Sequence, residues 1–102
     1  MDELQNLELA MADFVKQQAP EDVQEFIDLL STADITQEEV DEFRQIIIEG
    51  LTQPSEFPKM VRYLIRNEFI EEEDAPKEYD QGFALAMLGL VGVAQSIVGG
   101  QS

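Results

Sequence analysis

The 102-residue chain contains no cysteine, no histidine and no tryptophan. Without cysteine it forms no disulfide, carries no thiolate nucleophile and offers no sulfur ligand to a metal. Without histidine it lacks the side chain that most often transfers protons near neutral pH. These absences remove most enzyme classes, so we expect a protein that is not an enzyme and that binds no cofactor or metal ion.

Positive charge is also scarce. Six lysine and arginine residues stand against 22 aspartate and glutamate residues, which gives a formal net charge of -16. Nucleic acids and anionic membranes repel such a chain, so we expect no direct contact with nucleic acid. The first residues, "MDELQNLELA", are acidic where a secretory signal would be basic, which predicts a cytoplasmic protein.

The hydrophobic pattern predicts helices and no strands. Apolar residues recur at steps of three and four, no segment alternates with period two, and no hairpin dipeptide is present. We therefore predict one acidic helical domain over 1-102, an all-α compact bundle of about five short helices with an apolar C-terminal helix as its central element. The amphipathic helices occupy 1-80, an uncharged core or interface helix occupies 81-98, and 99-102 form a frayed tail.

The first predicted helix, about 2-18, ends at Pro20, which also suits the first turn of the second. Its apolar stripe contains Leu4, Leu7, Met11, Phe14 and Val15, with Glu8 to one side. The fourth helix begins near Pro58 and ends near Asn67, and Asp80 is the expected N-cap of the fifth.

The clearest local signal is "ITQEEV", residues 35-40. Thr36 and Glu39 have the spacing of a capping box, in which the hydroxyl accepts from the Glu39 amide and the carboxylate from the Thr36 amide. A third helix should begin at Gln37 and end near Gly50, a residue suited to a left-handed cap.

The segment "GFALAMLGLVGVAQSIVGG" carries no charge. A membrane span needs about 20 apolar residues and basic flanks, so we expect no membrane span. Its glycines predict close approach of another helix. Two interpretations stay open: the helix is enclosed by the other four, or one side of it meets a partner. The interface would then consist of Phe83, Met87, Leu90, Val91, Ala94 and Ile97.

Three of the six basic residues, Lys59, Arg62 and Arg66, share one face of the fourth predicted helix. They either pair with neighbouring carboxylates or form a docking patch for a partner.

The stretch "EFPKMVRYLIRNEFIEEEDAPKEYDQGFALAMLGLVGVAQ", residues 56-95, resembles small helical virion-associated or assembly proteins of tailed bacteriophages. The resemblance covers about two-fifths of the chain. It implies a non-enzymatic structural or accessory protein that works by protein-protein contact, in the virion or during its assembly, and it assigns no functional residue.

The leading hypothesis is therefore a non-enzymatic protein-protein interaction or assembly module that binds a partner or forms a homo-oligomer. The alternative is an acidic DNA mimic or decoy that binds a cationic nucleic-acid-binding protein through its first half.

Overall fold

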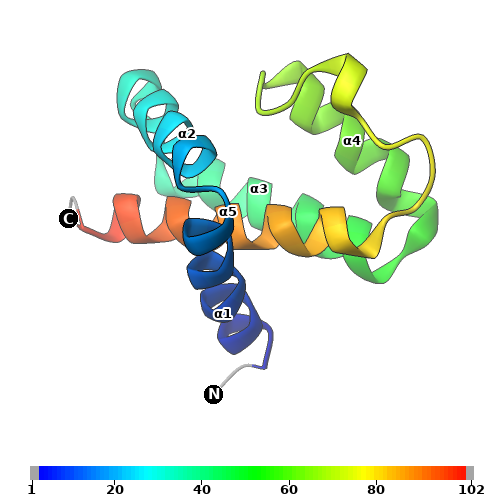
Figure 1. The fold of residues 1–102 in the computed structure, drawn as a ribbon, viewed down its shortest axis with the longest axis horizontal. Helices are drawn as coiled ribbons and strands as arrows, with labels where there is room; N and C mark the ends of the chain where they lie inside the picture. Colours follow the sequence, from blue (N-terminus) through cyan, green and yellow to red (C-terminus); the bar gives the residue numbers. More distant parts are fainter. Residues whose placement is uncertain (1–2, 101–102) are drawn as a thin grey trace.

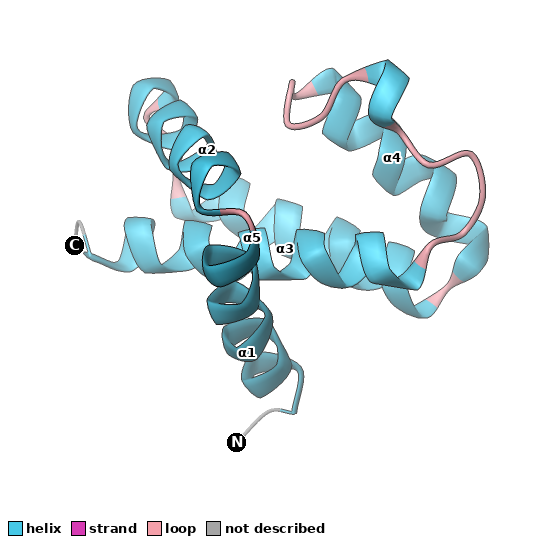
Figure 2. Cartoon of the chain, in the orientation of Figure 1, coloured by secondary structure: helices cyan, strands magenta, loops and turns pink. Residues whose placement is uncertain are grey.

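The computed structural model describes residues 3-100, except the side chains of Leu4, Gly99 and Gly100, and in that range it contains helices and no strand (Figures 1 and 2). The five α-helices are α1 (Glu3–Gln18), α2 (Pro20–Ala33), α3 (Gln37–Thr52), α4 (Phe57–Arg66) and α5 (Gln81–Gly100). Two short 3-10 helices, η1 (Pro54–Glu56) and η2 (Glu72–Asp74), precede and follow α4. The predicted all-α bundle is thus confirmed. Of the tail expected at 99-102, the backbone of 99-100 belongs to α5, and 101-102 lie outside the described residues.

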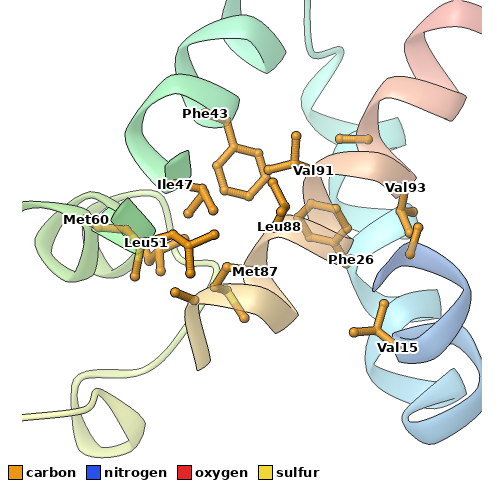
Figure 3. Packing of buried hydrophobic residues seen from close by; sticks show 14 of the residues in the cluster. Val15, Phe26, Phe43, Ile47, Leu51, Met60, Met87, Leu88, Val91 and Val93 are labelled. Atoms are coloured by element: carbon orange, nitrogen blue, oxygen red, sulfur yellow. The ribbon is translucent and has the colours of Figure 1, made fainter. Parts of the chain in front are cut away.

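The apolar helix α5 is the central element. It contacts α1, α2 and α3, while α4 packs mainly on α3 (Figure 1). Leu88 and Val91 of α5 are completely buried, beside Phe43 and Ile47 of α3 (Figure 3). Every described apolar side chain of α5 is at least half-buried, because the helix has neighbours on several sides.

Helix α1 crosses α5 at two glycines. A Cβ at Gly89 would lie 2.6 Å from the backbone oxygen of Met11, and one at Gly92 would lie 2.9 Å from the backbone oxygen of Glu8. Real Cβ contacts are almost never so short, so both positions need glycine for the backbones to approach. The close helix contact predicted from these glycines is confirmed.

The orientation of α1 differs from the prediction. Phe14 is 53% exposed, whereas Ala12 and Val15 are buried against the bundle and Glu8 is only 3% exposed. Val15 of the predicted stripe is buried, and Leu7 and Met11 are half-buried, so the prediction is wrong at Phe14. Small residues and a paired carboxylate allow α1 to lie closer to α5 than Phe14 would.

Helix α3 begins as predicted and ends later. The Thr36 hydroxyl accepts from the Glu39 amide at 3.3 Å, although the Glu39 carboxylate accepts from the same hydroxyl rather than from the Thr36 amide. Gly50 is no left-handed cap, since the helix continues to Thr52. It is buried under Met60 of α4, where a Cβ would lie 2.8 Å from the Met60 Cβ.

The connector between α4 and α5 is held at both ends. After α4, the amide of Glu68 donates to Ile65 and that of Phe69 to Leu64, with Glu68 in the left-handed region at φ 63°. This is a Schellman motif with glutamate at the position that glycine usually takes. Before α5, Asp80 accepts from the Phe83 amide at 3.1 Å, as expected of an N-cap.

Candidate functional site

A groove lies over α5, between α2 and the connector that follows α4. Figure 1 shows where these three segments lie in the fold. It encloses about 540 Å³. Its floor is apolar and consists of Phe26, Leu29, Phe69, Ile70, Met87 and Leu90. Its rim consists of five exposed carboxylate residues, Asp22, Glu25, Glu68, Glu71 and Asp74. We call this feature the acidic-rimmed groove.

An aromatic cluster fixes the connector wall of the groove. The ring of Phe69 lies 5.5 Å from that of Phe26 and 5.1 Å from that of Phe43, measured between centroids. Tyr63 stacks on Phe43 at 6.1 Å and also lies 6.4 Å from Phe69. These distances are typical of favourable aromatic pairs, so the Schellman turn that brings Phe69 inward also leaves Glu68 and Ile70 beside the opening.

The charge around the groove has one sign. Among the described residues, no lysine or arginine lines it. The described part of the chain also contains no group of three carboxylates close enough to hold a metal ion. The rim carboxylates therefore surround an apolar surface without converging on a point, and they suit several separate positive charges better than one cation.

The predicted interface residues divide between three environments. Met87 and Leu90 lie in the groove floor. Val91 and Ala94 have no exposed surface, so they contribute to the core and not to an open surface. Phe83 and Ile97 are half-buried, and the Phe83 ring packs edge to face on Phe57 at 6.2 Å.

The predicted docking patch lies elsewhere. Lys59, Arg62 and Arg66 are exposed on the outer side of α4 and do not line the groove. Within residues 3-100, none of the three comes within 4.0 Å of a carboxylate oxygen. Arg62 borders a separate cavity of about 250 Å³, together with Lys77 and Tyr79. The Tyr79 hydroxyl donates to the Leu51 carbonyl at 2.6 Å.

A buried polar network joins three helices. The Glu8 carboxylate of α1 accepts from Arg44 Nε of α3 at 3.1 Å and from Gln95 Nε2 of α5 at 3.0 Å. Both carboxylate oxygens are thus satisfied, which a buried charge requires. The network borders a polar cavity of about 230 Å³ that Gln5 and Asp41 also line, and its hydrogen bonds fix α1 against α3 and α5.

We predict that Arg44→Met destabilises the protein by about 2 kcal/mol, because the Glu8 carboxylate keeps its burial but loses its charged partner. The expected cost is below that of a fully buried pair, since the Arg44 side chain is 27% exposed. Urea denaturation of Arg44→Met and of the exposed-site control Lys59→Met measures the difference. Equal midpoints in the two variants would contradict a structural role for the network.

Among the described residues, the side chain of Tyr63 has a clearly shifted pKa. Burial raises the pKa of Tyr63 above its usual value of 10.0, and the neighbouring carboxylates of Glu42 and Glu39 raise it further. The phenol is neutral at physiological pH, and the Tyr63 ring packs against Phe43 and Phe69.

Sequence reasoning found only two groove residues, Met87 and Leu90. It missed the contributions of α2 and of the connector, because the groove forms where segments distant in sequence meet. One local signal was available: in "NEFIEEED", residues 67-74, two large apolar residues stand inside an acidic run, and such residues need burial or a partner.

By length and composition alone, α5 is also the one helix in the described part of the chain that could cross a membrane, a test that core helices of soluble proteins pass too. Neither a protein-family model, nor a curated protein, nor a solved structure matches this chain.

Proposed function

We propose that this chain is a non-enzymatic protein-binding module and that the acidic-rimmed groove is its binding surface. The observation that carries the proposal is the apolar floor of the groove, because surface clefts lined by large apolar and aromatic side chains are the usual anchor sites of protein interfaces. The resemblance of residues 56-95 to tailed-phage assembly proteins is consistent with a cytoplasmic or virion assembly role.

The charge of the rim favours a different protein over a second copy of this chain in the groove. A symmetric dimer through two facing grooves would bring the five carboxylates of one copy against the same five of the other. Like charges facing each other across an interface are unfavourable. Homo-oligomers, if they form, therefore use another surface.

Site-specific photo-cross-linking tests this proposal. A photoreactive phenylalanine analogue replaces Leu90, which is half-buried in the groove, and in a control protein it replaces Leu9, which is 56% exposed on α1. In the natural host cell, we expect the Leu90 position to yield one discrete adduct that maps to one segment of another protein, and the Leu9 position to lack it.

Three results would contradict the proposal. They are equal adduct patterns at both positions, no adduct at the Leu90 position, and an adduct only to a second copy of this chain. Deletion of residues 81-102 is not a usable control, because it removes the helix that contacts α1, α2 and α3.

The acidic decoy is the second candidate function. Its support is that the described carboxylates are nearly all exposed, with one ion pair, Arg44 to Glu8, among residues 3-100. A decoy works through charge density, so its binding would fall steeply with salt and would be insensitive to the apolar floor. Substitution of Leu90 therefore separates the two functions.

A further inference from the structure

We propose that the occupant of the acidic-rimmed groove is a basic amphipathic segment of the partner protein, with apolar side chains on the floor and lysine or arginine side chains against the rim. This inference rests on the proposed function and adds the chemistry of the partner.

The floor selects for an apolar face. Leu29, Ile70 and Leu90 line the groove and are half-buried, so three different elements each leave apolar surface open to an occupant. A cavity of about 540 Å³ accommodates several side chains, which is the size range of established ligand sites. A segment that presents a stripe of apolar residues, such as one face of a helix, would bury this surface.

The rim selects for positive charge on both edges of that stripe. Asp22 and Glu25 stand on the α2 side, while Glu68, Glu71 and Asp74 stand on the connector side. A neutral segment would bring these carboxylates close to apolar side chains without any compensation. Cationic side chains beside the apolar stripe would instead pair with them and raise the association rate of the two proteins.

Other occupants fit less well. A single metal ion would need converging carboxylates, and residues 3-100 contain no such group. A nucleic acid or an anionic lipid surface carries the same charge sign as the rim. The groove of a second copy of this chain also carries that sign.

A substitution at Glu68 can weaken binding without destabilising the protein, so that a loss of affinity cannot be attributed to unfolding. It holds the left-handed position at φ 63°, where glycine is preferred. Glu68→Gly should therefore raise the thermal midpoint by about 4 °C while removing one rim carboxylate. We expect it to weaken binding of a basic peptide about two-fold, which is a loss of affinity in a more stable protein.

The experiment uses the full chain and three synthetic peptides. The first carries leucine and lysine at helical spacing, so that one face is apolar and its edges are basic. The second has the same composition in scrambled order, and the third has glutamine in place of every lysine. Titration calorimetry at low and at physiological salt measures each dissociation constant.

Two pairs of variants locate the binding site. Leu90→Ala truncates an apolar side chain in the groove floor. Its matched control, Leu9→Ala, truncates an exposed leucine on α1. A rim variant neutralises three carboxylates around the groove, and its control neutralises three exposed carboxylates elsewhere. The rim variant is Glu25→Gln, Glu71→Gln and Asp74→Asn, and the control is Glu3→Gln, Asp13→Asn and Glu38→Gln.

We expect the basic amphipathic peptide to bind most tightly. Leu90→Ala should weaken it about ten-fold and Leu9→Ala should leave it unchanged. The rim variant should weaken it about ten-fold at low salt and the control variant by much less, because exposed ion pairs act at short range.

Each other outcome overturns a distinct claim. If the glutamine peptide binds as tightly as the basic one and Leu90→Ala weakens both, the groove binds protein but the cationic inference is wrong. If the scrambled peptide binds equally and Leu90→Ala has no effect, binding is by charge alone and the groove is not the site. If no peptide binds, the inference is wrong, and cross-linking at Leu90 still decides the proposed function.

Discussion

Val91→Lys should unfold the protein, whereas Leu90→Lys, one position earlier on α5, should leave it folded. Val91 has no exposed surface and lies in the main core, so its replacement would bury an unpaired ammonium group. We expect a loss of at least about 5 kcal/mol, which equals the whole stability of a marginally stable domain. At Leu90 the lysine stem can follow the groove floor while its charge reaches the rim carboxylates, at a cost of about 1 kcal/mol.

Circular dichroism and urea denaturation of the two variants check this prediction. The comparison also decides between the two interpretations of the uncharged helix, because a fully enclosed helix would tolerate a charge at neither position, whereas a helix with one side open to a partner tolerates it on that side alone. A folded Val91→Lys variant would show that α5 is not enclosed as described. A folded Leu90→Lys variant further serves as a groove mutant with reversed charge, which should not bind the basic peptide.

Gly89→Ala should destabilise the protein by about 3 kcal/mol, although alanine is the better helix former. The added Cβ would lie 2.6 Å from the Met11 backbone oxygen and 2.8 Å from the Met11 carbonyl carbon. Backbone atoms cannot rotate away as a side-chain end can, so α1 as a whole must move off α5. That movement would strain the Glu8 network and open the core around Val15.

Gly82→Ala, in the same helix, is the matched control. Gly82 is exposed, and the nearest atom to its added Cβ would be an Asp80 carboxylate oxygen at an ordinary 3.4 Å. We expect this variant to gain up to about 1 kcal/mol from helix propensity. Thermal unfolding of both variants gives the answer: a gain in stability at both positions would mean that α1 does not touch α5 at Gly89.

The sequence predicted local structure well where a residue type acts through contacts with its immediate neighbours in the chain. The Thr36 hydroxyl, the Asp80 carboxylate and the prolines act within a few residues of themselves, so helix starts could be predicted from spacing alone. Glycines were ambiguous, because a glycine can either end a helix or allow another helix to approach closely. Gly89 and Gly50 both lie where another element approaches, but only the three-dimensional neighbour distinguishes a contact from a cap.

The groove could not be predicted, because it depends on tertiary contacts. Phe69 becomes part of its wall only because Phe26 and Phe43 receive the ring. The environment of Glu8 was mispredicted for a related reason: its partners Arg44 and Gln95 are 36 and 87 positions away. No helical periodicity records such a pairing.

The central position of α5 has a consequence for synthesis of the chain. Helices α1, α2 and α3 leave the ribosome before α5 exists, yet each of them packs against it. Their apolar faces therefore remain exposed to solvent until α5 is synthesised. This period is longest for α1, since its contacts with α5 span most of the chain. Nascent segments with exposed apolar faces tend to aggregate. The many carboxylates of the first half would keep neighbouring nascent chains apart during that delay, and the acidity of this protein would then serve its folding in addition to the binding proposed above.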